Sequence, residues 1–530
     1  MAAFQLTGAA ACVALVSMIP PKCLRVFPYL ALVLATLAAR ADVRLPGVFS
    51  DNMVLQQGMR VPVWGWSDDG EKITVTFRGR SISTTASHGK WMLKLPVQKA
   101  GGPDSLTVEG RNRIELTGVL VGEVWICSGQ SNMEWPLSRS FESDKDIAAS
   151  ANPNLRLLTV PKLKANEPVD NINARWQESG PESVKGFSAV AYYFGRDLQK
   201  ARGVPVGLIH TSWGGSPAEV WIRETVLAAD PSYKHDILDP FAEQFKANQA
   251  DLAKWDKEAE DLKKEGKKPA RDRPWPIWKP AELYNGMIAP LIPFAIKGAI
   301  WYQGESNAGR AWQYRTLFPD MIRNWRRDWG QGDFTFLAVQ LAPWDRNKKR
   351  SVEEITAAPG DSDWAELREA QLLSTRALPG VGLAVITDVG DKDDIHPTRK
   401  EPVGARLALL ARGIAYGDKV EYSGPVYRSM RVKGNKVILT FDRVGGGLES
   451  RGGRLRGFAI CGADGKFVWA NAELDSARTV AVSSPQVEKP VAVRYGWADY
   501  PVVNLFNREG LPASPFRTDD FPLTTKPKKK

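Results

Sequence analysis

A serine and a histidine, far apart in the sequence, are of types that could perform nucleophilic chemistry together. Ser131 stands in a turn at 128–133, directly after an apolar run that ends at Cys127. In an open parallel sheet, ligands collect beyond the carboxyl ends of the strands, so a serine at this point is placed for catalysis. The alternative is a serine that only caps the following helix. The G-x-S-x-G motif of α/β-hydrolases is absent from the sequence.

His396 is the histidine best placed to act as the base for such a serine. It stands at the end of the turn-rich segment 391–397, which follows another apolar run at 381–386. A carboxylate beside the imidazole would fix its tautomer and stabilise the imidazolium formed when it takes the serine proton. Asp393 and Asp394 are both candidates for this acid, and Asp393 is slightly favoured by its spacing from the histidine.

The surrounding patterns predict an α/β chain with additional β domains at both ends. Short alternating runs predict an N-terminal β-sandwich over 42–118. Buried apolar runs alternating with helical stretches predict a catalytic domain with a parallel sheet over 119–418. A charge-dense segment at about 230–280 predicts a helical insertion on its surface. Alternating runs return in a C-terminal β-sandwich at 419–517, which a basic tail at 518–530 follows.

The first 41 residues predict a secretory signal peptide. Cationic Lys22 and Arg25 precede an apolar run at 27–38, and a small-x-small cleavage site ends at Ala41. The apolar run is too short to span a bilayer comfortably, so no integral membrane segment is expected after cleavage. The protein is therefore expected to be secreted or periplasmic. The sequence leaves open whether translation starts at the first residue or at Met18.

Charge and motif content narrow the classes of partner and cofactor. The formal net charge is +11, but cations concentrate in 1–41 and in the tail 526–530, and no basic stripe is interleaved with aromatic residues. Nucleic-acid binding is therefore not expected. There is no H-E-x-x-H motif, no P-loop and no zinc-type cysteine spacing, so no metal is expected. Cys127 and Cys461 remain after signal cleavage and are expected to be unpaired buried thiols.

Several blocks of the sequence share the pattern of a known family. They are Gly129-Gln-Ser-Asn-Met133, Thr211-Ser-Trp-Gly-Gly215, Leu283-Tyr-Asn-Gly-Met287, Trp301-Tyr-Gln-Gly-Glu-Ser-Asn307 and Asp394-Ile-His-Pro397. Together, over roughly 43–515, they resemble the sialate O-acetylesterase family of SGNH hydrolases. The resemblance implies an SGNH-type parallel sheet flanked by helices. It also implies removal of acetyl groups from sialic acids or related glycans through an acetyl-serine intermediate, with no cofactor.

The resemblance also implies roles for individual residues. Ser131 resembles the nucleophile, and its own backbone N–H would be one donor of the oxyanion hole. Gly214 or Gly215 would provide a second N–H, because a residue without a side chain lets the backbone approach the ester. The side-chain amide of Asn307 would be the third donor. Losing one such donor typically costs on the order of 100-fold in rate.

Residues next to these blocks are candidates for substrate binding. Gln130 precedes the nucleophile, and Gln303 and Glu305 precede Asn307. Glu305 is expected to orient Gln303 or a backbone amide rather than to act on the substrate. Arg310 would favour sialic acid if it lay at the pocket mouth, because that sugar carries a carboxylate.

Two alternatives stay open at the level of sequence. The same chemistry would serve an acetylxylan or other plant-glycan deacetylase. A non-catalytic glycan-binding protein, in which the flanking β domains bind the sugar, is the alternative outside the enzymes. The sequence does not indicate an oligomeric state.

Overall fold

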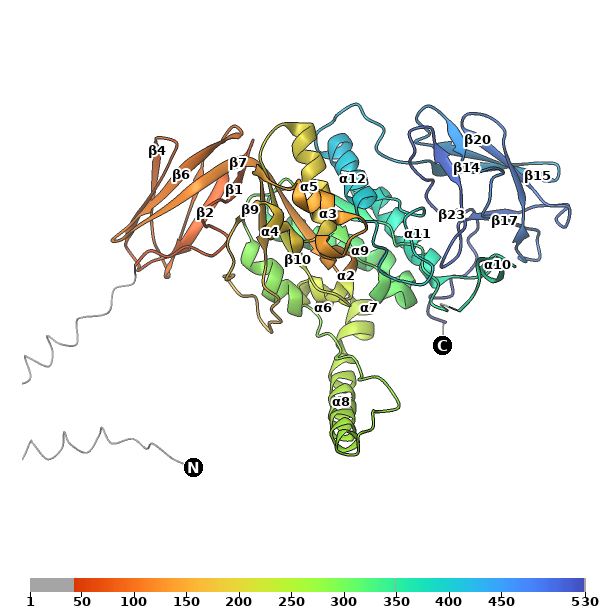
Figure 1. The fold of residues 1–530 in the computed structure, drawn as a ribbon, viewed down its shortest axis with the longest axis horizontal. Helices are drawn as coiled ribbons and strands as arrows, with labels where there is room; N and C mark the ends of the chain where they lie inside the picture. The colour runs from red at the N-terminus through yellow and green to blue at the C-terminus, as the bar shows by residue number, and fades with distance from the viewer. Residues whose placement is uncertain (1–41, 348, 529–530) are drawn as a thin grey trace, which may run out of the picture.

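The central part of the chain forms a mostly parallel sheet, and a β domain precedes it and another follows it in the sequence. The computed structural model describes residues 42–347 and 349–528, so the predicted signal peptide lies outside the described residues. In Figure 1 the N-terminal strands stand at one end of the molecule, the helices gather at the centre, and the C-terminal strands stand at the other end. The predicted α/β class is confirmed.

The central sheet has the strand order β13-β12-β11-β7-β10-β8-β9, in which only β9 is antiparallel to its neighbour. Its strands are β7 (Arg113–Gly129), β8 (Asn152–Thr159), β9 (Gln177–Ser179), β10 (Val206–Ser212), β11 (Gly298–Tyr302), β12 (Thr335–Val339) and β13 (Val381–Ala384). Strands β10 to β13 are buried along their whole length. Burial on both faces explains their unbroken apolar sequences.

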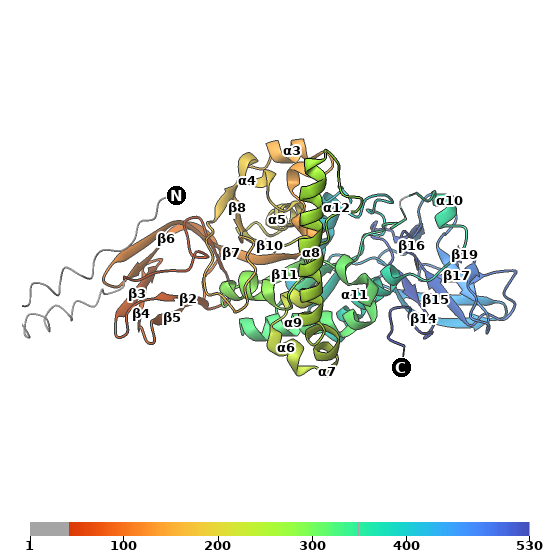
Figure 2. The same cartoon turned by 90° about the horizontal axis from the view of Figure 1, so that it is seen from below.

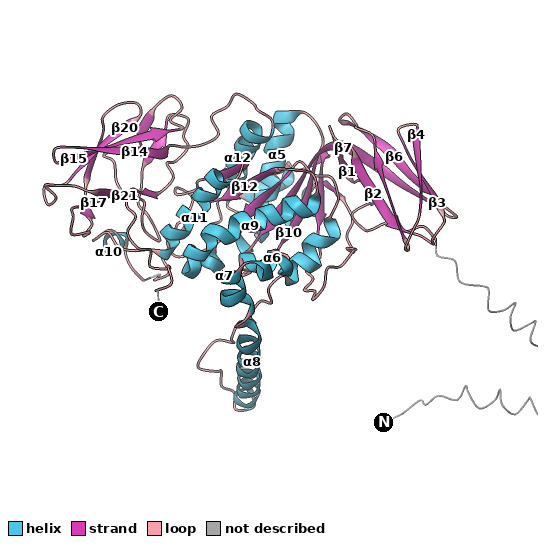
Figure 3. Cartoon of the chain, turned by 180° about the vertical axis from the view of Figure 1, so that it is seen from behind, coloured by secondary structure: helices cyan, strands magenta, loops and turns pink. Residues whose placement is uncertain are grey.

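Helices cover both faces of this sheet, as Figure 3 shows. The helices are α2 (Ser131–Glu134), α3 (Ser143–Ala148), α4 (Pro181–Lys185), α5 (Ala189–Arg202), α6 (Glu224–Ala229), α7 (Pro231–Tyr233), α8 (Phe241–Lys264), α9 (Ala311–Trp329), α10 (Val352–Ile355), α11 (Asp363–Ala377) and α12 (Glu401–Leu410). Alternate residues of β7 face opposite layers. Trp125 and Cys127 share a core with α5 and α12, whereas Ile126 shares one with α9 and α11.

The long strand β7 belongs to the N-terminal β domain and to the central sheet at once. Its first half pairs with β6 (Gly101–Glu109) and β1 (Val54–Gln56), and its second half pairs with β10 and β11. The other N-terminal strands are β2 (Val61–Trp66), β3 (Lys72–Phe77), β4 (Arg80–Thr85) and β5 (Lys90–Leu95). The boundary predicted between residues 118 and 119 therefore falls inside one continuous strand.

The C-terminal domain consists of antiparallel strands around a core of its own. The strands are β14 (Val426–Lys433), β15 (Lys436–Asp442), β16 (Leu448–Ser450), β17 (Phe458–Cys461), β18 (Val468–Trp469), β19 (Asn471–Leu474), β20 (Thr479–Ser483), β21 (Ala492–Tyr495), β22 (Leu505–Asn507) and β23 (Phe516–Arg517). They form two four-stranded sheets and one two-stranded sheet. Cys461 here and Cys127 in β7 are both buried free thiols.

Helix α8 lies outside the body, and the segment 265–280 returns beside it (Figure 1); seen from below, the helix crosses in front of the central part of the molecule (Figure 2). Leu252 is the single buried residue among the 24 residues of α8. This charge-rich helix lies within the segment 230–280, where the sequence predicts a helical insertion. Among the described residues, no helix combines the length and the apolar character needed to cross a membrane.

Candidate active site

The fold brings Ser131 and His396 into direct contact. Ser131 is the first residue of α2, immediately beyond β7, and His396 lies on the loop that follows β13. Because both strands are parallel members of one sheet, their carboxyl ends open on the same edge. His396 Nε2 lies 2.8 Å from Ser131 Oγ. The ring of Trp135 stacks on the imidazole at 5.5 Å between centroids, which helps to fix the orientation of the histidine.

Of the two candidate acids, Asp394 is the one that faces the imidazole. Its Oδ1 lies 3.5 Å from His396 Nδ1 and accepts the backbone N–H of His396 at 2.8 Å. Asp393 instead pairs with Lys392. The slight preference for Asp393 that spacing suggested is therefore not supported by the geometry. At 3.5 Å, and with 56% of the Asp394 side chain exposed, the contact is weaker than a buried triad hydrogen bond.

The environment of His396 favours its neutral form. Burial lowers the pKa of His396 below its usual value of 6.5, and the charges of Lys400 and Arg139 lower it further, whereas Asp394 acts to raise it. A neutral imidazole can accept a proton from Ser131. The site is therefore suited to general-base chemistry at neutral pH.

Gly214 lies against the serine, but its N–H group already has a partner. A Cβ at Gly214 would lie 3.2 Å from Ser131 Cβ, so the close approach favours glycine. The Gly214 N–H donates to Glu134 Oε2 at 2.7 Å, and Lys162 pairs with the same carboxylate. Gly215 lines the cavity with a φ of 75°, which glycine adopts without strain. The sequence blocks did not identify Glu134, although it stands three residues after Ser131.

Asn307 and Gln303 lie behind the cavity wall rather than in it. Asn307 is 1% exposed, and its Nδ2 donates to Glu219 Oε2 at 3.0 Å. Its Oδ1 accepts from the Ala218 N–H and from Gln303 Nε2. Gln303 is fully buried and also accepts from the hydroxyl of Tyr314. The expected third oxyanion donor at Asn307 and the expected substrate contact at Gln303 are therefore both engaged within the protein.

Glu305 forms part of a polar network next to Ser131. Its Oε1 accepts from Asn132 Nδ2 at 2.6 Å, so it orients Asn132 and not Gln303, which was one of the two groups that the sequence suggested beside a backbone amide. Asn132 Oδ1 accepts in turn from the ammonium of Lys400, which is 1% exposed. Burial lowers the pKa of Lys400 to about 7 and raises the pKa of Glu305. Sequence reasoning missed Asn132 and Lys400 because the hydrogen bonds that join them to Glu305 and to each other span distant parts of the chain.

Ser131 and His396 open into a cavity of about 1130 Å³. Of the four residues that the sequence suggested for substrate binding, Gln130, Glu305 and Arg310 line it, and Arg310 pairs with Glu219 at 2.5 Å. Other parts of the wall were not foreseen from the sequence. They come from Lys162, Lys164 and Trp213, and from residues 236–244 and 275–280 at the two ends of the insertion.

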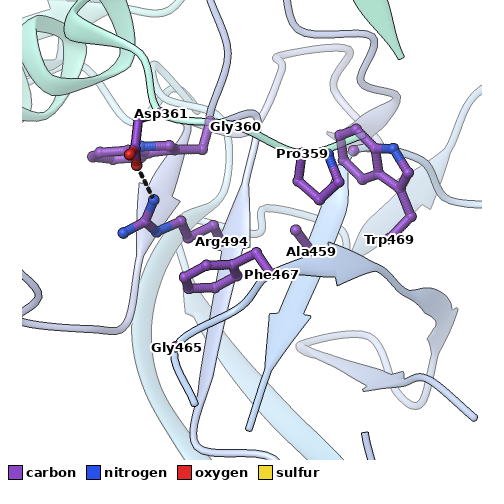
Figure 4. A pocket seen from close by; sticks show the side chains of 10 residues that line it. Pro359, Gly360, Asp361, Ala459, Gly465, Phe467, Trp469 and Arg494 are labelled. Atoms are coloured by element: carbon purple, nitrogen blue, oxygen red, sulfur yellow. Dashed lines mark hydrogen bonds and ion pairs between the residues drawn. The ribbon is translucent and has the colours of Figure 1, made fainter. Parts of the chain in front are cut away.

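Of several smaller cavities, one of about 170 Å³ lies at the C-terminal domain (Figure 4). Two charged residues line it: the Arg494 guanidinium stacks on Phe467 at 4.2 Å from the ring centroid and pairs with the Asp361 carboxylate at 3.2 Å. The same guanidinium also pairs with buried Asp519. Its described lining residues include no serine, cysteine or histidine. The cavity at Ser131 contains the contact between Ser131 and His396, and it is the candidate active site.

No group of three or more histidine, cysteine, aspartate or glutamate side chains that could hold a metal ion occurs in 42–347 or 349–528. The residues gathered around Ser131 are instead a hydroxyl, an imidazole and backbone N–H groups. This set matches acyl transfer from an ester.

Comparison with known proteins gives a consistent assignment. The family model described as carbohydrate esterase, sialic acid-specific acetylesterase matches residues 121–247 and 273–407, which include both Ser131 and His396. Sialate O-acetylesterase from Homo sapiens is 28% identical over 520 residues, covering 89% of this chain and 92% of the human protein. The Mus musculus sialate O-acetylesterase is 28% identical over 545 residues, covering 93% of this chain and 97% of its own.

The crystal structure of a carbohydrate acetylesterase from Xanthomonas citri is similar over the whole architecture. It shares 39% identity, covers 91% of this chain and 100% of its own, and superposes with a TM-score of 0.77. The gap in the family match, 248–272, falls on most of α8 and the segment that returns from it. The chain belongs to the sialic acid-specific acetylesterase family of carbohydrate esterases and is a carboxylic ester hydrolase that acts on acetylated sugars.

Proposed function

We propose that the protein is a serine esterase that removes O-acetyl groups from sialic acids or related glycans through an acetyl-serine intermediate. The observation that carries this proposal is the 2.8 Å contact between Ser131 Oγ and His396 Nε2 at the cavity. A non-catalytic glycan-binding role is set aside, because the chain belongs to a family of hydrolases.

In the proposed reaction, His396 Nε2 takes the proton of Ser131 as Oγ attacks the acetyl carbonyl carbon. The carbonyl oxygen becomes an oxyanion, and the bond between the acetyl carbon and the sugar oxygen then breaks. The sugar leaves as an alcohol with the proton that His396 held. Water, activated by the same imidazole, attacks the acetyl-serine and releases acetate.

The oxyanion would be stabilised by backbone N–H groups. We assign one donor to Ser131 itself and the second to Gly215, because the Gly214 N–H is held by the Glu134 carboxylate. A carboxylate at that position would repel a developing negative charge. Lys162 pairs with Glu134 and so offsets part of this repulsion. Asn307 is left out of the proposed donors, since its amide is held by Glu219.

The acid–base assignment predicts a specific pH dependence. Only neutral His396 can act as the base, so kcat/KM should fall as pH falls through the pKa of His396, and the midpoint should lie below 6.5. Asp394→Asn removes the carboxylate that raises this pKa, so the acid limb should move to lower pH. Because Asp394 is largely exposed, we expect only about a tenfold loss of kcat/KM at neutral pH.

Asp393→Asn is the matched control, since it removes a neighbouring carboxylate that does not face the ring. It should leave kcat/KM within about twofold of wild type, with the acid limb unmoved. Steady-state rates with p-nitrophenyl acetate across the acidic range give both quantities. An effect of Asp393→Asn equal to or larger than that of Asp394→Asn would overturn the assignment of Asp394.

Acetate release from candidate glycans tests the substrate. Each cation that lines the cavity is paired with a carboxylate: Lys162 with Glu134, Lys164 with Glu282 and Arg310 with Glu219. This partial neutralisation favours a second candidate, an acetylxylan or another neutral plant glycan. O-acetylated sialic acid and acetylated xylan should be compared at equal acetyl concentration. A higher kcat/KM on xylan would replace the sialate assignment, and no release from either would refute the proposed function.

Export remains part of the proposal. The predicted signal peptide would be cleaved near Ala41, so the mature protein should begin at Asp42. N-terminal sequencing of protein recovered from the periplasm or the medium would test this. Recovery of the intact N-terminus in the cytoplasm alone would contradict it.

A further inference from the structure

We propose that the insertion forms a glycan-binding wall, so that the enzyme acts on acetylated oligosaccharide or polysaccharide chains rather than on single acetylated sugars. The wall consists of Trp213 beside the catalytic centre and of Trp275 and Trp278 from the insertion. The proposal rests on the proposed esterase function and adds a substrate class to it.

The position of the insertion is the first observation. Both of its ends, 236–244 and 275–280, line the same cavity as Ser131 and His396. The cavity volume of about 1130 Å³ is at or beyond the upper end of the range of roughly 300–1,000 Å³ typical of small-molecule sites. A single acetylated sugar would leave much of this space unfilled. The volume therefore suits a chain of several sugar units.

The insertion contributes little to the core of the protein. Of α8, only Leu252 is buried, so the helix adds little apolar burial to the catalytic domain. Its return segment nevertheless brings a large aromatic residue, Trp275, to the cavity with 87% of its surface exposed. Tryptophan is enriched at binding interfaces, where one part of the side chain is apolar and another is polar. Tryptophan offers both an apolar face for a sugar ring and an N–H donor for a hydroxyl.

The backbone that carries Trp275 is held firmly against α8. Asn248 donates to the Trp275 carbonyl at 2.9 Å and accepts the Ile277 N–H at 3.1 Å, so one side chain holds the backbone from Trp275 to Ile277. Just before Trp275 in the chain, Arg271 forms two hydrogen bonds with Asp251, and Arg273 forms two with Asp256. Exposed pairs of this kind add little stability, but paired guanidinium contacts fix geometry. The ring is therefore presented on an ordered segment before any sugar binds, which lowers the cost of binding.

The wall is linked to the catalytic centre through Trp213. Trp213 precedes Gly214, and its ring meets Trp278 edge to face at 5.4 Å between centroids. Lys164 Nζ lies 4.0 Å from the centroid of Trp278 and 5.8 Å from that of Trp213. Lysine N–H groups among aromatic faces can donate to sugar hydroxyls while the rings contact the apolar faces of the sugar. This combination recognises a hydroxyl-rich chain.

Trp275→Ala tests the wall without touching the catalytic residues. Wild-type kcat/KM should be higher for acetylated xylan fragments of increasing length than for an acetylated monosaccharide. In Trp275→Ala, kcat/KM for the longer fragments should fall roughly tenfold, the size expected of one aromatic contact, mainly through KM. Activity on p-nitrophenyl acetate should not change. Trp275→Phe keeps a ring and should recover most of the loss.

Trp469→Ala provides the matched control, because Trp469 is another exposed tryptophan but lies in the C-terminal domain. It should not change the dependence on chain length. O-acetylated sialyl-oligosaccharides beside free O-acetylated sialic acid would repeat the comparison with an acidic glycan. No length dependence in the wild type, or equal losses on p-nitrophenyl acetate and on the fragments in Trp275→Ala, would overturn the proposal.

Calorimetric binding of deacetylated xylan fragments separates the failure of the wall from the failure of the esterase. The fragments carry no acetyl group, so their binding does not depend on catalysis. We expect weaker binding to Trp275→Ala than to wild type by roughly tenfold in Kd. Equal binding would overturn the wall even if the protein is an esterase, whereas absence of any ester hydrolysis would refute the proposed function and leave the binding comparison valid.

Discussion

Replacing Ser131 with alanine is expected to lower kcat/KM for acetyl esters by roughly four orders of magnitude or more. The alanine variant lacks the oxygen that attacks the carbonyl, and His396, 2.8 Å away in the wild type, has no proton to accept. Backbone donors and substrate binding would remain and would leave only a small residual rate. Hydrolysis of p-nitrophenyl acetate and acetate release from acetylated glycans both measure the loss.

Ser306→Ala is the matched control for this experiment. Ser306 lines the same cavity and is exposed, but it does not contact His396. The change should leave kcat/KM within about twofold of wild type. Retention of more than about a tenth of the activity by Ser131→Ala would show that another group is the nucleophile. Mass spectrometry of the peptide containing Ser131 after quenching a reaction would give a direct check, since the acetylated serine should be detectable.

The sequence was sufficient to predict the α/β class and the pairing of Ser131 with His396. Both residues follow apolar runs that predict buried strands of a parallel sheet. At the edge of a parallel sheet, the carboxyl ends of strands that are distant in the sequence lie close together. The order of the sequence blocks along the chain indicated one family, the sialate O-acetylesterases. The fold class and the positions of the two residues depend on periodicity and on position after a strand, which are local properties of the sequence.

The choice of acid could not be made from spacing alone. The turn that carries His396 is shaped by Asp391, whose Oδ1 accepts the N–H groups of Asp393 and Asp394. That turn directs Asp394 to the imidazole and leaves Asp393 with Lys392. A difference of one residue in a tight turn reverses which side chain faces the base. Such a difference depends on backbone geometry that a spacing rule does not contain.

Asn307 shows a second limit of inference from sequence. The block that contains it was recognised, but the partners of its amide, Glu219 and the Ala218 N–H, come from a segment almost ninety residues earlier in the chain. The charge pattern of the insertion likewise predicted a surface helix. It could not reveal that the return segment reaches the cavity beside Trp213, because that contact joins distant parts of the sequence.

Asn132→Ala is expected to destabilise the catalytic domain by about 3 kcal/mol, because Asn132 bridges the buried ammonium of Lys400 and the half-buried carboxyl group of Glu305. Its Nδ2 donates to Glu305 at 2.6 Å and to the Ile395 carbonyl at 3.0 Å, and its Oδ1 accepts from Lys400. Alanine would leave the ammonium and the carboxylate without this bridge. Because Asn132 follows Ser131 and holds the loop of His396 through Ile395, kcat should fall as well. Thermal unfolding gives the stability, and Asn154→Ala, a change at an exposed position, is the control.

The pH dependence of the stability lost in Asn132→Ala identifies which of its contacts causes the loss. The pKa of Lys400 is about 7 in the folded protein and roughly 10.4 when unfolded, so the unfolded chain holds one more proton between these values. The cost of burying this lysine therefore falls as pH rises above about 7. Asn132 Oδ1 stabilises the charged form, so the deficit of Asn132→Ala relative to wild type should be largest below about pH 7 and should shrink toward pH 9. A deficit that is equal at both pH values would exclude the Lys400 charge and leave the contacts to Glu305 and Ile395 as its source.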